Sequence, residues 1–270
     1  MAISLFICQK SKAVIRKTSL KSKNNIEFLD ATTNEAIQYY LSKNYDVAAL
    51  NHANSFTPGG GYKKGSMAQE EDICMSSPFF YAALDVAAKK GFYKTWGKDW
   101  NSQVLYTPNA PFIREESKKN YKILSASYKA SIITAAAPDF RKITNSKEIP
   151  KNSEYENLIK QIYYAPIVVK EGKINLKCTS KIDKIPKPQV LIVGALGCGA
   201  FRFKETFKRD NHEYTYSEFM AERFVEVLSN LGGHYKKICF AIPKSLDKNN
   251  YDTFKKKFIE NEKNFKSVSF

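Results

Sequence analysis

Several short runs of consecutive apolar residues recur along the chain, and none of them alternates between apolar and polar positions. Strands that are apolar on both faces are typical of a sheet that helices cover on both sides. The runs therefore predict the buried strands of an α/β sheet, at Val47–Leu50, Val104–Tyr106, Ile132–Thr134, Val190–Val193 and Ile238–Ile242.

Segments with helical periodicity lie between these runs. The clearest begins with capping-box spacing at Thr215 and Glu218 and ends at Gly232 and Gly233. Its apolar stripe has the spacing of one helix face: Met220, Phe224, Val227, Leu228 and Leu231. Further helices are predicted at Thr32–Asn44, Ser76–Lys90, Asn152–Tyr164 and Tyr251–Phe265.

Helices that alternate with buried strands predict a three-layer α/β/α fold with a mixed, largely parallel central sheet. We expect one domain over residues 1–270 with a core at about 46–243. Residues 1–45 are expected to form an N-terminal helical extension, and residues 244–270 a Lys-rich C-terminal helix. Residues 166–188 are more polar and are interpreted as an insertion.

The amino-acid composition indicates where in the cell the protein is found and which kind of partner it binds. The chain has 270 residues, no long apolar segment and no secretory signal pattern, so we expect an intracellular, cytoplasmic monomer. Nuclear access is open in a eukaryotic or viral setting. The net charge is +16, but most of the 43 basic residues are Lys and are spread along the whole chain. This indicates a solvated positive surface that attracts polyanions, without sequence-specific nucleic-acid binding.

Cysteine and histidine are too sparse for a disulfide framework or a metal site. The five cysteines form no C-x-x-C pair, and the three histidines are scattered. We therefore expect no metal and no cofactor.

Two glycine-rich loops follow two of the predicted strands. Val47–Leu50 leads into NHANSFTPGGG, and Val190–Val193 leads into GALGCGAFRF. Ligands of open α/β sheets bind at the carboxyl ends of the strands, and glycines allow backbone N–H groups to approach phosphate oxygens. Each loop alone could equally be a tight turn, but both at matching strand ends favour a ligand site.

Two adjacent carboxylates, Glu70 and Glu71, follow the first glycine loop and precede an apolar helix. Such a pair is usually solvated on a helix surface. Beside a bound sugar diphosphate, a carboxyl group can instead protonate a leaving group and then activate water. Partial burial would raise its pKa enough for it to carry the proton.

The glycine triplet, a seven-residue spacer and Gln69-Glu70-Glu71 resemble the signature of poly(ADP-ribose) glycohydrolases, a branch of the macrodomains. The stretches VAALNHANSFTPGGG, VLYTPNAPFIRE, SIITAAAPDF, LIVGALGCGAFRF and ICFAIP resemble blocks of the microbial-type family, in family order. The resemblance covers most of residues 46–243 and implies a macrodomain fold.

The resemblance also implies a role for each matching residue. Glu71 would be the catalytic acid/base at the ribose–ribose bond, and Glu70 would bind and orient the ribose. Phe201 would pack against the distal ribose and help to place the water. The remaining ADP-ribose-binding residues would be Asn51, Asn54, Gly59, Gly60, Gly61, Gln69, Ala195, Leu196, Gly197, Cys198, Gly199 and Ala200.

The activity implied is release of ADP-ribose from poly(ADP-ribose) or from an ADP-ribosylated protein. Two alternatives stay open: a hydrolase that removes single ADP-ribose groups from protein or nucleic acid, and a non-catalytic ADP-ribose-binding macrodomain. The intact Gln69-Glu70-Glu71 favours an enzyme. Asn51 stands where some relatives carry an acid, and Lys63 and Lys64 add charge to the catalytic loop.

Two neighbouring residues are assigned to packing. Cys198 has no evident His partner, so we do not expect a nucleophile there. His52, at the end of a predicted strand, is interpreted as a packing residue and not as a base.

Overall fold

The computed structural model describes residues 6–9, 23–93, 100–101, 103–141, 145, 148–170 and 186–270, without the side chains of 6–9 and 170. Of the expected 166–188 insertion, residues 171–185 lie outside this range. Residues 166–170 are the end of a helix that continues through Pro166.

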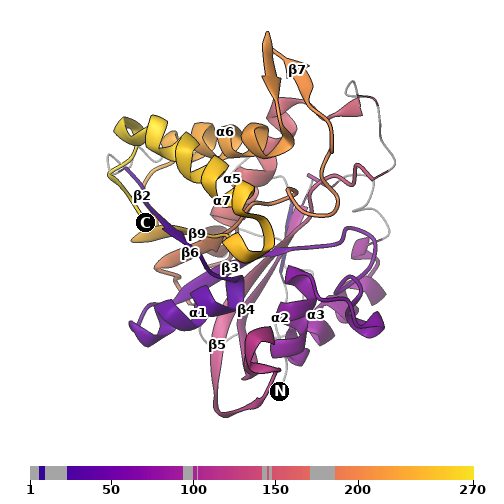
Figure 1. The fold of residues 1–270 in the computed structure, drawn as a ribbon. Coiled ribbons are helices and arrows are strands. Elements are labelled where there is room, and N and C mark those ends of the chain that lie inside the picture. The colour runs from indigo at the N-terminus through magenta and orange to yellow at the C-terminus, as the bar shows by residue number, and fades with distance from the viewer. Residues whose placement is uncertain are drawn as a thin grey trace.

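One mixed sheet forms the centre of the molecule, with the strand order β1-β4-β5-β3-β6-β9-β2-β10 (Figure 1). The pairs from β5 to β10 are parallel, whereas β4 is antiparallel to both β1 and β5. The mixed, largely parallel sheet expected from the sequence is therefore confirmed. Its strands are β1 (Phe6–Gln9), β2 (Asn25–Leu29), β3 (Val47–His52), β4 (Gln103–Arg114), β5 (Ile123–Ala135), β6 (Val190–Val193), β9 (Lys237–Ala241) and β10 (Ser267–Ser269).

Helices cover both faces of this sheet. In Figure 1, α5, α6 and α7 lie on one side, and α1, α2 and α3 on the other. A small hairpin of β7 (Phe207–Arg209) and β8 (His212–Tyr214) precedes α6. The helices are α1 (Thr33–Ser42), α2 (Gln69–Ser76), α3 (Pro78–Lys89), α5 (Asn152–Lys170), α6 (Tyr216–Ser229) and α7 (Lys244–Glu260), with 3-10 turns at Tyr62–Lys64, Ser117–Lys119 and Glu262–Asn264.

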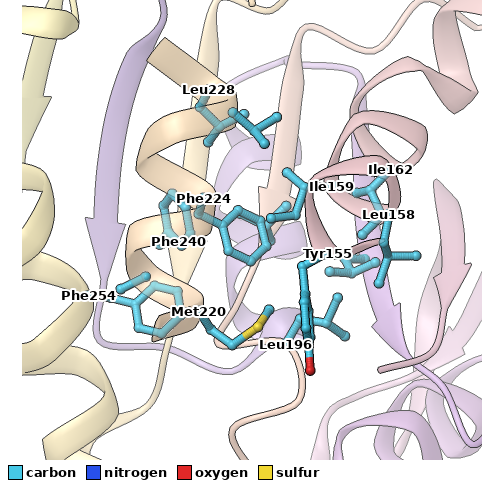
Figure 2. Packing of buried hydrophobic residues seen from close by; sticks show 14 of the residues in the cluster. Tyr155, Leu158, Ile159, Ile162, Leu196, Met220, Phe224, Leu228, Phe240 and Phe254 are labelled. Atoms are coloured by element: carbon cyan, nitrogen blue, oxygen red, sulfur yellow. The ribbon is translucent and has the colours of Figure 1, made fainter. Parts of the chain in front are cut away.

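Two hydrophobic cores explain why runs such as Val47–Leu50 are apolar on both faces. Ala48 and Leu50 of β3 face the core beneath α5, α6 and α7, whereas Val47 and Ala49 face the core above α1, α2 and α3. Figure 2 shows the larger core, in which side chains of α5, α6 and α7 meet around Phe240 of β9. Phe240 is fully buried. The three-layer α/β/α fold is thus confirmed.

The segment before residue 46 contributes more to the sheet than we expected. It contains α1, but β1 and β2 also belong to it and both pair within the central sheet. The C-terminal segment likewise ends in a strand, because β10 follows α7 and pairs in parallel with β2. These strands are short and partly polar, and their pattern alone does not mark them as strands.

The parallel strands place both glycine-rich loops at one edge of the sheet. His52 at the end of β3 is the partner of Ala135 at the end of β5, and Val193 at the end of β6 pairs with Phe240 of β9. The loops after β3 and β6 therefore leave the sheet side by side, as expected for a ligand site at the strand ends.

Candidate active site

Asn54 shapes the first loop as it leaves β3. Its side-chain Oδ1 accepts hydrogen bonds from the backbone N–H groups of Phe56 (2.8 Å) and Thr57 (2.9 Å). This is an Asx-type turn, in which a short side chain satisfies the backbone of the following residues. The turn directs the chain towards Pro58 and the glycine triplet.

The glycine triplet packs directly against the two carboxylates. Gly59 and Gly60 have φ angles of +69° and +57°, which glycine adopts at little cost. A Cβ atom on Gly60 would lie 2.4 Å from Oε1 of Glu71 and 3.0 Å from Oε2 of Glu70. A Cβ atom on Gly61 would lie 2.1 Å from Oγ of Ser66. Gly60 is thus required by the close approach of the loop to the acids of α2, and Gly61 by the approach of Ser66. We did not infer these reasons from the sequence.

Glu70 is held by the residues that end β3. It is 4% exposed, and its Oε2 accepts from the backbone N–H of Asn54 (2.8 Å) while its Oε1 accepts from Nδ2 of Asn51 (3.3 Å). Burial raises the pKa of Glu70 to about 8, and the negative charge of Glu71 adds to the rise. The hydrogen bonds from Asn54 and Asn51 lower this pKa but do not outweigh burial. Glu70 is therefore largely protonated at neutral pH.

Glu71 lies beneath the glycine loop and not in bulk solvent. Its side chain is 6% exposed, and its Oε1 accepts a hydrogen bond of 2.6 Å from the backbone N–H of Gly61. Its Oε2 is buried and forms no hydrogen bond with any described residue. Buried carboxylate oxygens normally have partners, so this atom is chemically unusual. It can exchange a proton with a group that enters the site.

Gln69 joins the start of α2 to the sheet. Its Nε2 donates to the carbonyl oxygen of Leu50 (2.7 Å) and to Oγ1 of Thr33 (2.9 Å), and its Oε1 accepts from the backbone N–H of His52 (2.8 Å). These bonds occupy its amide within the protein. They fix the register of α2 against β3, and thereby the position of the two acids.

The second loop runs from Gly194 to Phe201. The loop is tight at Gly197, which has a φ of +77° and packs against Ala137. It is open at Gly199, where a Cβ atom would meet nothing within 4 Å. Leu196 and Cys198 point into the core, while Gly199 and Ala200 are exposed. The loop therefore presents backbone, and not side chains, on its outer side.

Phe201 closes the second loop. Its carbonyl oxygen accepts from the backbone N–H of Phe140 (2.9 Å), which fastens the loop to the segment after β5. The guanidinium carbon of Arg141 lies 4.2 Å from the centre of the Phe201 ring, a cation–π contact.

The geometry supports the assignment of Cys198 to packing. His52 instead lines a cavity, and its Nε2 has no hydrogen-bond partner among the described residues. Burial raises the pKa of the Cys198 thiol to about 12, so a thiolate does not form near neutral pH. Burial lowers the pKa of His52 to about 4, so its ring is neutral. A Cβ atom on Gly194 would lie 2.9 Å from the His52 ring, which explains the glycine that follows β6.

A cavity of about 950 Å³ opens over the carboxyl ends of β3, β6 and β9. Of the expected site residues, Gln69 lies on one wall, and Ala195, Gly199 and Ala200 lie on another. The N-terminal turns of α1 and α7 complete it, with Thr32, Thr33, Ser245, Leu246 and Asp247. Glu70, Glu71 and Gly59–Gly61 are not among the described residues that line it. The acids therefore lie to one side of the cavity, under the first loop.

Sequence reasoning missed Asp72, which lines this cavity directly after the two acids. Its carboxylate accepts from Nδ2 of Asn34 (2.7 Å), from the hydroxyl of Tyr121 (3.0 Å) and from the backbone N–H of Ser117 (3.2 Å). Burial raises the pKa of Asp72. Asp72 thus fastens α1 and the tip of the β4–β5 hairpin to α2. These partners are remote in sequence, and no local pattern reveals them.

Among the described residues, no group of three His, Cys, Asp or Glu side chains is placed to hold a metal ion. None of the helices in the same part of the chain is both long enough and apolar enough to cross a membrane.

Known proteins share both the motif region and the fold. Residues 7–115 match the family model described as microbial-type PARG, catalytic domain. None of the curated proteins matches the chain.

Several solved structures share the fold at low sequence identity. A mutant of poly(ADP-ribose) glycohydrolase (PARG) from Deinococcus radiodurans, in complex with ADP-ribose, is 19% identical, with a TM-score of 0.69 and 95% of each chain covered. A second complex of the Deinococcus protein with ADP-ribose is 22% identical, with a TM-score of 0.66 over 89% of this chain and 86% of that one.

The PARG from Thermomonospora curvata is 21% identical, with a TM-score of 0.65 over 88% of this chain and 77% of that one. The resemblance stated from the motifs is therefore confirmed: the chain is similar to the microbial-type poly(ADP-ribose) glycohydrolases, in sequence over residues 7–115 and in fold over most of its length.

Proposed function

We propose that the protein is a poly(ADP-ribose) glycohydrolase that hydrolyses ribose–ribose O-glycosidic bonds and releases ADP-ribose. The observation that carries the proposal is the buried Glu71, whose Oε2 has no partner among the described residues and whose Oε1 is held by the glycine loop. The family match over residues 7–115 supports the same function.

The two loops supply backbone groups for the diphosphate and the distal ribose. We assign these contacts to Gly59–Gly61 on the first loop and to Ala195–Ala200 on the second, with Phe201 against the distal ribose. The adenosine end of the ligand would occupy the 950 Å³ cavity over the strand ends. Ligand pockets of this size are common at such strand ends.

In the reaction, Glu71 would protonate the 2′ oxygen that leaves the anomeric C1″ atom. Positive charge would develop on C1″ and its ring oxygen, close to the diphosphate of the bound ligand. The carboxylate of Glu71 would then take a proton from the water that attacks C1″, which restores the acid and yields ADP-ribose. The carboxyl group of Glu71 thus gives one proton to the leaving oxygen and takes one back from the water.

Glu70 would orient the ribose, together with Asn51 and Asn54. Both oxygens of Glu70 accept hydrogen bonds from these asparagines, so the group is fixed in place before a ligand arrives. Its raised pKa keeps Glu70 largely neutral near pH 7. Gln69 would lie near the ligand and would keep α2 and β3 in position through its hydrogen bonds.

A direct test compares two kinds of ADP-ribosylated carrier. The protein is incubated in parallel with a poly(ADP-ribosyl)ated and a mono(ADP-ribosyl)ated carrier, and released ADP-ribose is measured. Release from the polymer supports the proposal. Release only from the mono-modified carrier would identify a mono-ADP-ribosyl hydrolase, and binding of ADP-ribose without any release would identify a binding module. We also propose that the protein is a monomer and that it acts in the cytoplasm.

A further inference from the structure

Arg202 follows the second loop and lines the cavity next to it. A turn positions it, because its backbone N–H donates to the carbonyl oxygen of Gly199 (3.1 Å). Its Nη1 donates to the carbonyl oxygen of Cys198 (3.1 Å) and to Oδ2 of Asp247 at the start of α7 (3.2 Å). The guanidinium group is therefore held between the loop backbone and the start of α7, with the Arg202 side chain 44% exposed.

Asp247 and Asn250 fix the other side of this contact. Asn250 is buried, and its Nδ2 donates to the same carbonyl of Cys198 (3.3 Å) and to Oδ2 of Asp247 (3.1 Å). Asp247 also accepts from the backbone N–H of Asn250 through Oδ1 (3.2 Å). The loop, the arginine and α7 thus form one connected group of polar contacts on the cavity wall.

The other charged side chains of the described cavity lining have different tasks. Lys118 pairs with Glu35 (2.6 Å), and Asp72 accepts hydrogen bonds from the β4–β5 hairpin. Lys204 also lines the cavity, but it lies on an exposed stretch beyond the loop. Arg202 is the cation that the loop backbone itself holds in place.

Among the described residues, the Arg202 side chain forms its hydrogen bonds through Nη1. An arginine fork has further N–H donors, and two parallel bonds from it suit the oxygens of a phosphate group. Space is available next to it, because a Cβ atom on Gly199 would meet no atom within 4 Å.

We propose that Arg202 binds the diphosphate of ADP-ribose, and that the carboxylate of Asp247 competes with the ligand for its guanidinium group. The inference rests on the proposed function, since it names a further binding residue at that site. Asp247 pairs with Arg202 on the wall of the same cavity, so the phosphates must displace its carboxylate to reach the guanidinium group.

The test measures the affinity of the purified protein for ADP-ribose and for adenosine, which lacks phosphates. We expect Arg202→Gln to weaken ADP-ribose binding by about 10-fold to 100-fold, the usual effect of losing hydrogen bonds to a charged group. Arg202→Lys should restore part of this loss. Adenosine binding should be unchanged in both variants. Lys256→Gln removes the same charge from α7 at its exposed pair with Glu260, and serves as the matched control.

The second arm tests the competition. Asp247→Asn keeps an acceptor for Asn250 but removes the charge, and we expect it to strengthen ADP-ribose binding by roughly threefold to tenfold. The gain should vanish when Asp247→Asn is combined with Arg202→Gln, which a merely structural role would not produce. Equal ADP-ribose affinity in Arg202→Gln and Lys256→Gln would overturn the inference and leave the proposed function standing. Failure of the unaltered protein to bind ADP-ribose would instead overturn the proposed function.

Discussion

At the scale of single residues, the site depends on how closely the backbone approaches two acids. Gly60 lies so near to Glu70 and Glu71 that a methyl group at its α-carbon would overlap a carboxylate oxygen. The same approach buries both acids and brings the N–H of Gly61 within 2.6 Å of Oε1 of Glu71. Glycine at position 60 is therefore required by its packing against Glu70 and Glu71.

Gly60→Ala should damage activity because the new methyl group must displace Glu71. We expect a loss of stability of about 1–3 kcal/mol from overpacking and the positive φ, together with a strong fall in turnover. Gly65→Ala is the matched control, since Gly65 also has a positive φ (+78°) but a Cβ atom there meets nothing within 4 Å. It should cost about 1 kcal/mol from strain and leave turnover intact. Equal turnover of the two variants would contradict this account.

The raised pKa of Glu70 predicts how the stability of the protein changes with pH. Its pKa is raised in the folded protein to about 8, so the folded state keeps a proton that the unfolded state releases. Between the unfolded pKa of about 4.5 and the folded pKa of about 8, this group makes the protein less stable as the pH rises. Urea unfolding at about pH 5.5 and about pH 8.5 should show this loss, and Glu70→Gln should reduce it. A pH dependence unchanged by the substitution would remove Glu70 from this role.

At the scale of helices and strands, sequence patterns predicted the elements whose structure depends on residues close together in the chain. The capping box of α6 was read from Thr215 and Glu218, and the structure forms both of its hydrogen bonds. The buried strands were predicted because both of their faces are apolar. The position of Glu70 and Glu71 beside the first loop was predicted from their spacing to the glycine triplet alone.

Contacts between distant segments were not predictable in this way. The strands β2 and β10 exist because their neighbours in the sheet supply partners, and not because of their own composition. We expected a helix that ends at Tyr164 and an insertion from residue 166, but α5 continues to Lys170 and packs its apolar side chains into the larger core. Asp72 and Arg202 are recognised only from partners 45 residues away in each case, Ser117 and Asp247.

Thr215→Ala tests the helix cap at this scale. It removes the acceptor for the backbone N–H of Glu218, and we expect it to lower stability by about 1 kcal/mol, or to lower the melting temperature by about 2–4 °C. Thr215→Ser keeps the hydroxyl and should behave like the unaltered protein. Because Thr215 is exposed and does not line the cavity, turnover should not change. An equal melting temperature for the Ala and Ser variants would refute the role of the cap.

At the scale of the whole molecule, the sheet brings two loops to one edge, and the chain carries a net charge of +16. A positive surface attracts a polyanion over distances of about 10 Å at moderate salt, and added salt screens it. The polymer carries many phosphates, whereas a single ADP-ribose unit carries two. We therefore expect the positive charge of the protein to affect the binding of poly(ADP-ribose) more than the rate of the chemical step.

Salt should raise the KM for poly(ADP-ribose) while kcat changes little. We expect the KM for the polymer to rise several-fold between about 50 mM and about 200 mM salt, and the affinity for free ADP-ribose to change less over the same range. Steady-state rates and direct binding measurements would show the difference. Equal salt dependence for the polymer and for ADP-ribose would exclude a contribution of the wider surface.

The central claim is that the carboxyl group of Glu71 transfers the proton at the scissile bond. The most direct measurement is the rate at which Glu71→Gln releases ADP-ribose from poly(ADP-ribose), with ADP-ribose affinity measured on the same preparation. We predict a fall in turnover of roughly 10²–10⁴-fold with affinity largely retained, since the amide keeps the size of the side chain but cannot act as acid and base. Turnover equal to that of the unaltered protein would contradict the claim.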